Sequence, residues 1–297
     1  MKTPVTLDFR HLHARPVVIP HTDNLEIIQV GAGGTGSALA GLLSRLVILL
    51  QSRWTTIRYA IVDFDHVEDT NVPRQMFAYA EIGLPKALAL AQRYSLAWGI
   101  PIEAITQPYT AHLFQPPSFN TTRILVGCVD STEARAEMHK SLTSGYDRSM
   151  RTWLIDAGNE KTTGQILLGC CAQEEFLNSA FQIPTLCSRL PAPGLIHPEL
   201  IDTTTTPKKT TPAPSCAQLA ITHAQSLGIN PRMASEMMDM LTRLLLTGDL
   251  TRFATYLDLD TGSMRSLYTT PLGVAQSINQ DPSTLFHKTR RPRAKAA

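Results

Sequence analysis

The segment Leu25-Glu-Ile-Ile-Gln-Val-Gly31-Ala-Gly-Gly-Thr-Gly36 joins a short apolar run to a glycine-rich loop. The apolar run predicts a buried strand, and the stretch 38–51 after it predicts a helix. A loop of this kind lets backbone amides approach a phosphate closely, although a tight strand–helix turn is the alternative. The glycines that form or extend the pattern Gly-x-Gly-x-x-Gly are Gly31, Gly33, Gly34 and Gly36. The segment therefore favours a nucleotide-binding α/β fold.

Strand and helix patterns alternate after this segment. Apolar runs predict strands at 59–64, 124–129, 153–156 and 165–170, and helical stretches predict helices at 85–98 and 132–142. Strands that alternate with helices indicate a Rossmann-like, doubly wound α/β fold with a mainly parallel sheet and helices on both faces.

The composition changes near Phe181. From there to Ser215 the chain is rich in Pro and Thr and predicts a mobile crossover loop. Two helices are expected beyond it, at 216–227 and 231–247, the second with Asn230 as N-cap, followed by a hairpin at 253–269. The predicted division is an irregular segment 1–24, a main domain 25–180, the loop 181–215, a C-terminal part of the same fold 216–285 and a basic tail 286–297.

The bulk properties fit a globular protein with a substantial core, since 43% of the residues are hydrophobic and 18% are charged. The formal net charge of +2 includes five basic residues in the tail, so the rest of the chain is mildly acidic and nucleic-acid binding is not expected. No secretory signal and no apolar run long enough to span a bilayer are visible. The five irregularly spaced cysteines suit the reducing cytoplasm and contain no Cys-x-x-Cys pair for zinc.

A second polar segment, Ile61-Val-Asp63-Phe-Asp65 to Gly83-Leu-Pro-Lys86, follows the predicted strand at 59–64. Asp63, at the end of that strand, is placed to bind a ribose, and Asp65 lies beside it. An amide, a guanidinium, a second amide and an ammonium then follow in Asn71, Arg74, Gln75 and Lys86. These groups have no role in hydride transfer, but they fit ATP. Arg74 and Lys86 could offset the charge that grows on phosphate oxygens when a carboxylate attacks the α-phosphorus.

A further acidic residue, Asp130, follows the predicted strand at 124–129. Its carboxylate could ligate Mg²⁺, which prefers one or two carboxylates together with phosphates. Alternatively, Asp130 could cap the helix expected from Thr132. The attacking carboxylate is ionised at neutral pH, so catalysis would consist of positioning and electrostatics.

The glycine loop, the segments 63–75 and 83–86, and the run Cys128-Val-Asp130-Ser-Thr-Glu-Ala-Arg135 together resemble the ThiF/MoeB/E1 ubiquitin-activating superfamily. Within it, the chain most resembles the ThiF-family protein of bacterial PRTRC gene systems. The resemblance implies Mg-ATP-dependent adenylation of the C-terminal glycine of a small ubiquitin-like, β-grasp protein, with release of pyrophosphate. It places Gly34, Asn71, Arg74 and Lys86 at the phosphates, Asp63 at the ribose and Asp130 at the metal.

In many relatives a cysteine beyond a mobile loop then takes the activated carboxyl as a thioester. Cys216 follows the predicted loop and precedes a predicted helix, whose dipole would lower its thiol pKa. Cys187 is the second candidate, and adenylate as the final product is the alternative. Cys128, Cys170 and Cys171 lie in apolar strands and are expected to be inert.

The chain departs from relatives at its N-terminus. The segment Phe9–Arg15 lacks the Arg-Tyr-x-Arg-Gln motif that supplies an arginine to the partner protomer, which leaves a homodimer open. Two other functions also stay open. An NAD(P)- or FAD-dependent oxidoreductase would predict a bound dinucleotide or flavin after purification. A catalytically silent scaffold for a ubiquitin-like partner would tolerate loss of Arg74 or Lys86.

Overall fold

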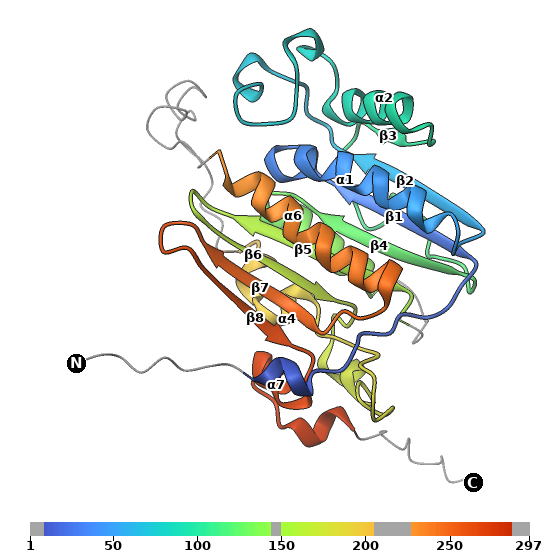
Figure 1. The fold of residues 1–297 in the computed structure, drawn as a ribbon, viewed down its shortest axis with the longest axis vertical. Helices are drawn as coiled ribbons and strands as arrows, with labels where there is room; N and C mark the ends of the chain where they lie inside the picture. Colours follow the sequence, from blue (N-terminus) through green and yellow to red (C-terminus); the bar gives the residue numbers. More distant parts are fainter. Residues whose placement is uncertain (1–8, 144–149, 205–226, 287–297) are drawn as a thin grey trace.

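The structure is a computed structural model that describes residues 9–143, 150–204 and 227–286. Its centre is an eight-stranded sheet in the order β3-β2-β1-β4-β5-β6-β7-β8 (Figure 1). The parallel strands are β1 Asn24–Val30, β2 Thr56–Val62, β3 Glu103–Ile105, β4 Thr121–Gly127 and β5 Thr152–Asn159. The antiparallel extension consists of β6 Thr163–Gly169, β7 Arg252–Asp258 and β8 Ser263–Tyr268. The predicted α/β class and the predicted hairpin are confirmed.

Helices cover both faces of the sheet. Helices α1 Gly34–Leu50 and α6 Ile229–Thr242 lie side by side on one face, and α6 continues into the π-helical turn Arg243–Thr247 (Figure 1). On the other face, α3 Thr132–Ser141 and α4 Pro193–Ile196 pack against β4, β5 and β6. Helix α2 Lys86–Trp98 packs beside α1 and β3, and α7 Pro271–Ser277 follows β8. None of the helices in the described ranges has the length and apolar character needed to cross a membrane.

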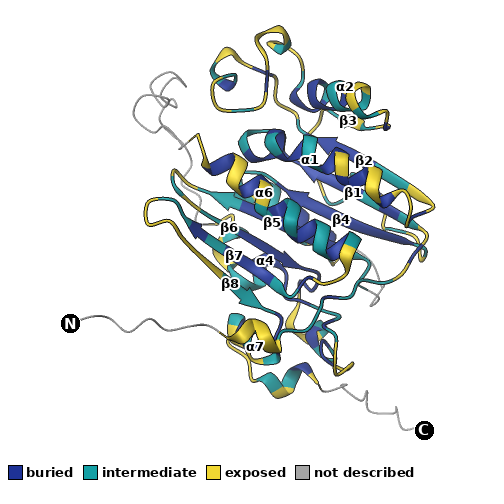
Figure 2. Cartoon of the chain, viewed as in Figure 1, coloured by how far each residue is buried: buried dark blue, intermediate teal, exposed yellow. Residues whose placement is uncertain are grey.

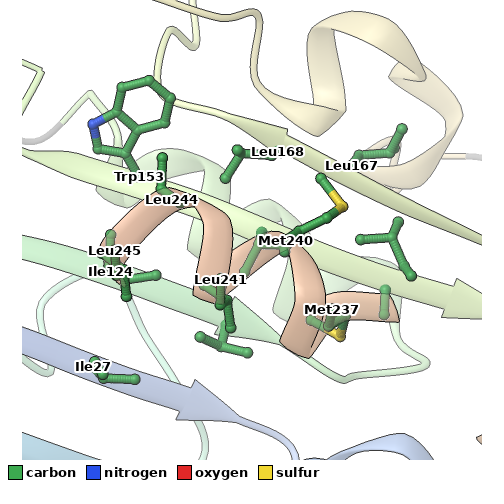
Figure 3. Packing of buried hydrophobic residues seen from close by; sticks show 14 of the residues in the cluster. Ile27, Ile124, Trp153, Leu167, Leu168, Met237, Met240, Leu241, Leu244 and Leu245 are labelled. Atoms are coloured by element: carbon green, nitrogen blue, oxygen red, sulfur yellow. The ribbon is translucent and has the colours of Figure 1, made fainter. Parts of the chain in front are cut away.

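Two hydrophobic cores follow from the alternation of side chains along the central strands. In β1, Ile27 joins the core beneath α1 and α6, whereas Ile28 joins a smaller core with Met138 of α3. Both isoleucines are fully buried, as are most residues of the central strands (Figure 2). Figure 3 shows Met237 and Leu241 of α6 above the sheet, with strand residues of the first core around them. A sheet buried on both faces explains why its strands read as continuous apolar runs.

The order of the strands creates a switch point beside β1. The chain leaves β1 for β2 and β3 on one side and then returns to β4 on the other side. The loops that follow β1 and β4 therefore separate at the carboxyl edge of the sheet. In open α/β sheets, ligands bind in the crevice at this position.

The expectation of a mobile loop from Phe181 onward is wrong for residues 181–204. The side chains of Phe181, Cys187 and Leu190 are at most 1% exposed, and the segment contains α4. Cys187 forms a β-bridge with Val17 of the N-terminal segment. Apolar residues among the prolines supply enough buried area to order this part, which the overall composition had hidden. Residues 205–226, which include all but the last residue of the predicted helix at 216–227, and the tail from residue 287 lie outside the described residues.

Two helix boundaries also differ from the expectation. Helix α1 begins at Gly34 rather than at Ala38, so the loop is shorter and its last glycines form the first helical turn. Asn230 is not an N-cap, because α6 begins at Ile229 and Gly228 occupies the cap position. The local cap signal was overruled by contacts that the Asn230 side chain makes elsewhere.

Candidate functional site

An open cavity of about 1140 Å³ lies at the carboxyl ends of the parallel strands and is called the main cavity below. Loops after β1, β2 and β4 line it, together with the ends of β5, β6 and β7. The predicted site residues on its wall are Gly31, Gly33, Gly34, Asp63, Asp65, Asn71, Arg74, Gln75, Lys86 and Asp130. Residues that are far apart in sequence thus meet at the switch point of the sheet. Gly36 lies behind the wall, and Cys216 is outside the described residues.

The glycine loop is held by a buried glutamine. Gln29 Nε2 donates to the carbonyl oxygens of Gly31 and Gly36 at 3.0 and 2.9 Å, and the Tyr59 hydroxyl donates to Gln29 Oε1 at 2.8 Å. Gly31 has a φ of +97°, in the left-handed region that favours glycine. A Cβ on Gly36 would lie 2.1 Å from the Gly31 oxygen, so only glycine lets the helix approach the loop this closely. The loop is thus held in one conformation, in which Gly31, Gly33 and Gly34 line the main cavity.

Asp63 lies where β2 meets the glycine loop. Its Oδ2 accepts from the Ala32 amide at 2.6 Å, and its Oδ1 accepts from the Asp65 amide at 2.8 Å. Burial raises the pKa of the Asp63 carboxyl above its ordinary value, and the two amides and the Lys86 charge counteract this rise only in part. The carboxylate is thus fixed in orientation and largely removed from water, as suits an acceptor for ligand hydroxyls.

Lys86 and Asp65 form an ion pair on the cavity wall. Lys86 Nζ lies 3.0 Å from Asp65 Oδ2, and the lysine side chain is 9% exposed against 52% for the aspartate. Lys86 is the first residue of α2, where Pro85 occupies the N-cap position. The helix start holds the ammonium group at the cavity, while the more exposed carboxylate can turn away to water. This pair can therefore exchange for a pair between Lys86 and an anionic ligand.

The loop after Glu68 carries three of the predicted polar residues. Asn71 is buried, and its Oδ1 accepts from the Glu68 amide, which closes a short 3-10 turn. Arg74 is exposed and bonds the Thr70 carbonyl through Nε at 3.3 Å, which leaves further N–H groups for a ligand. Gln75 Oε1 is buried on the cavity wall without a hydrogen-bond partner among the described residues. The turn thus brings a guanidinium and an unsatisfied amide to the main cavity.

Asp130 is exposed on the cavity wall just beyond β4. The cap of α3 is Ser131, whose hydroxyl accepts from the Ala134 amide at 3.2 Å, so the capping alternative for Asp130 is wrong. In the described part of the chain, no group of three or more His, Cys, Asp or Glu residues could hold a metal. A single carboxylate fits Mg²⁺ only where phosphate oxygens of a nucleotide supply further ligands.

The sequence reasoning missed a polar cluster at the start of α1. Thr35 donates to Asn159 of β5 and to Asn230 of α6, each at 3.2 Å, and Asn159 Nδ2 donates to Asn230 Oδ1 at 3.3 Å. Gly34 leaves room for this contact, since a Cβ there would lie 2.3 Å from Asn230 Nδ2. The cluster ties the glycine loop to α6 and to β5. The only sequence signal for this cluster was Asn230 next to Pro231, and this pair also matches the pattern of a helix N-cap.

We expect Asn230→Ala to lower the free energy of unfolding by about 1–3 kcal/mol, because it removes the oxygen that accepts hydrogen bonds from both Thr35 and Asn159. Urea denaturation would measure the change, with exposed Gln182→Ala as a matched control that stays within about 0.5 kcal/mol of wild type. Equal stability of the two variants would mean that the cluster does not hold α6 to α1.

The described cysteines are unsuited to acyl transfer. Cys170, Cys171 and Cys187 are at most 1% exposed, and burial raises the thiol pKa of Cys128, Cys171 and Cys187. A thiol must ionise to act as a nucleophile, so the raised pKa makes Cys128, Cys171 and Cys187 poor nucleophiles, and burial removes Cys170 from substrates, in line with the expectation for Cys128, Cys170 and Cys171. Cys187 is thereby excluded as a reactive thiol, because it packs in the core.

Comparison with known proteins gives one family match and several similar folds. The family model described as "ThiF family" matches residues 21–265. E. coli MccB, in a structure with succinimide, is 14% identical over 83% of this chain and 64% of its own, with a TM-score of 0.51. PaaA is 17% identical over 82% of this chain and 64% of its own, with a TM-score of 0.49. No curated protein matches the sequence. The chain thus spans about 64% of the length of these solved chains.

Proposed function

Because this chain belongs to the ThiF family, we propose that it is an E1-like enzyme that uses Mg-ATP to adenylate a carboxylate. The observation that carries the proposal is the gathering of Asp63, Arg74, Lys86 and Asp130 around one cavity beside the glycine loop. In the reaction, an oxygen of the acceptor carboxylate bonds to the α-phosphorus of ATP. The bond from that phosphorus to the bridging oxygen breaks, and pyrophosphate leaves with its electron pair. The product is an acyl-adenylate.

Each side chain has a distinct task in this proposal. The glycine-loop amides and the N-terminus of α1 bind phosphate oxygens, and the oriented Asp63 carboxylate accepts hydrogen bonds from the ribose hydroxyls. Lys86 and Arg74 offset the charge that develops on the α-phosphate and on the leaving pyrophosphate. Asp130 is the residue that would hold Mg²⁺, which would supply positive charge to neutralise the phosphates. Asn71 and Gln75 position the loop and contact the nucleotide.

The dinucleotide alternative explains less of the cavity wall. A nicotinamide or flavin cofactor would use the glycine loop and Asp63, but it gives no role to the buried ammonium of Lys86 or to Arg74. These cations suit a triphosphate that gains charge during the reaction. The adenylation proposal therefore accounts for the larger part of the site.

The acceptor is proposed to be the C-terminal carboxylate of a small protein or peptide. A structure of E. coli MccB contains AMPCPP and MccA, which are ligands of MccB itself. For this chain, we propose as the acceptor a β-grasp protein that ends in glycine, and as a later step a thioester at Cys216. The same proposal includes a homodimer, a cytoplasmic location and membership of the PRTRC-associated subfamily.

ATP–pyrophosphate exchange with Mg²⁺ and candidate small ubiquitin-like proteins or peptides tests the proposal. We expect exchange that requires the acceptor and that falls by about 100-fold or more in Arg74→Ala, because a cation is lost from the developing charge. Arg53→Ala, an exposed arginine just beyond the C-terminal end of α1, is the matched control and should keep wild-type exchange. ATP binding without exchange for any acceptor would favour a scaffold, and failure to bind ATP would refute the proposal.

A further inference from the structure

A second, small cavity of about 10 Å³ lies on the α3 face of the sheet, between α3, α4 and β5. It shares Arg135 with the wall of the main cavity. The remaining polar members of its lining are His139 of α3 and Asp156 of β5. Its volume is on the order of what a single water molecule needs.

Two buried polar atoms of this lining have no hydrogen-bond partner among the described residues. They are Asp156 Oδ1 and His139 Nδ1. Asp156 is 2% exposed, and its other oxygen, Oδ2, accepts from Arg135 Nε at 3.0 Å. A buried carboxylate oxygen without a hydrogen-bond partner is unfavourable, so a bound ligand that donates a hydrogen bond to it would be strongly favoured.

Both unpartnered atoms are acceptors. Burial lowers the pKa of His139, so the ring is neutral at pH 7, and a hydrogen bond with the backbone of Ala172 favours its protonated form. That bond belongs to Nε2, because Nδ1 has no partner among the described residues, and Nε2 therefore carries the proton. The cavity thus needs a ligand that donates two hydrogen bonds. A cation is disfavoured by the adjacent guanidinium of Arg135, whereas water donates twice and can accept from an arginine N–H.

The space for this ligand depends on a glycine of α4. A Cβ on Gly194 would lie 2.8 Å from His139 Nδ1 and 2.7 Å from Ile201 Cδ1. Only the absence of a side chain at this position leaves room beside the imidazole nitrogen. His139 Nδ1 therefore lacks a hydrogen-bond partner among the described residues and also has free space beside it.

The ion pair between Arg135 and Asp156 connects this small cavity with the loop after β4 on the wall of the main cavity. Arg135 Nη2 donates to the Val129 carbonyl at 2.6 Å and to the Ala157 carbonyl at 3.4 Å. Val129 precedes Asp130, so the position of the Asp130 turn depends on the orientation of the Arg135 guanidinium. That orientation depends in turn on Asp156, which is held on one side only by Arg135.

We propose that one buried water bridges Asp156 Oδ1 and His139 Nδ1, and that this water-linked Asp156–Arg135 pair positions the Asp130 turn. The water site stands on the geometry alone, whereas its effect on the nucleotide rests on the function proposed above. Asp156 and His139 are positioning residues that act through Arg135.

A crystal structure of the full chain at high resolution tests the water site. We expect a water peak at hydrogen-bonding distance from both atoms in the wild type, and its loss in Gly194→Ala, whose methyl group occupies the space. Empty density, or a direct hydrogen bond between His139 and Asp156 across a closed cavity, would overturn the water site. This outcome does not depend on any enzymatic activity.

The Mg²⁺ dependence of exchange tests the positioning role. In Asp156→Asn, we expect the Mg²⁺ concentration for half-maximal exchange to rise by about 10-fold or more, as for other residues that orient a metal ligand. Arg135→Lys should raise this concentration as well, because lysine cannot hold Asp156 and Val129 together. Wild-type exchange with an unchanged Mg²⁺ dependence in Asp156→Asn would overturn the positioning role. Absence of exchange in the wild type would count against the proposed function and leave the crystallographic result as the test of the water.

Discussion

Lys86→Met should lower the rate of ATP–pyrophosphate exchange by about 100- to 1000-fold, the largest activity loss that we expect from one substitution. Methionine keeps the length and apolar stem of the buried side chain but removes the ammonium group. The loss should appear in kcat more than in the KM for ATP, because the charge that Lys86 offsets grows mainly in the transition state.

The same substitution should leave the fold nearly unchanged. Lys86 pairs with Asp65, whose side chain is 52% exposed and can be solvated by water once the lysine is gone. An ion pair of this kind contributes about 0–1 kcal/mol, so the free energy of unfolding should change by no more than that. Lys140→Met, which removes a surface lysine paired with Glu137, is the matched control and should change neither quantity. Full exchange activity in Lys86→Met would contradict the role of the ammonium group.

Gly36→Ala should damage both stability and nucleotide binding. The added Cβ would lie 2.1 Å from the Gly31 oxygen, so α1 must move away from the glycine loop. Gln29 bonds the carbonyls of both glycines and would lose at least one of these bonds. We expect the free energy of unfolding to fall by about 1–3 kcal/mol. A displaced loop should also weaken ATP binding, because its amides move away from the phosphate oxygens.

Gly33→Ala separates these two effects. A Cβ on Gly33 meets no atom within 4 Å, but it stands on the wall of the main cavity. We expect stability close to wild type and weaker ATP binding, since the methyl group hinders the approach of phosphate to the amides. Urea denaturation and calorimetric titration with Mg-ATP measure the two quantities. Wild-type stability and ATP affinity in Gly36→Ala would show that the loop tolerates a wider turn.

Local patterns predicted four of the five parallel strands and most of the site, whereas the short strand β3 was missed. The apolar runs predicted β1, β2, β4, β5 and β6 because strands buried on both faces consist almost entirely of apolar residues. The polar residues Asp63, Asn71, Arg74 and Lys86 stood out because a core segment has no use for them. Their meeting at one cavity followed from a rule of topology, since carboxyl ends of parallel strands share one edge.

Features that depend on distant partners were not predictable. Gln29 lies in an apolar run, and its role became visible only with Tyr59 and the two glycine carbonyls around it. Asn230 was assigned to a helix cap because its neighbours match that motif, whereas its actual partners are 195 and 71 residues away. Cys187 was a candidate thiol until packing against the N-terminal segment placed it in the core.

The sequence by itself determined the fold class, the glycine loop and the set of charged groups around the main cavity. Each of these depends on short-range patterning that the chain carries in contiguous segments. Only the tertiary structure decided which polar residues are buried, which acceptors lack a partner and where a glycine leaves room for a ligand. Asp156, His139 and Gly194 belong to three separate elements, and their common cavity exists only once α3, β5 and α4 have packed together.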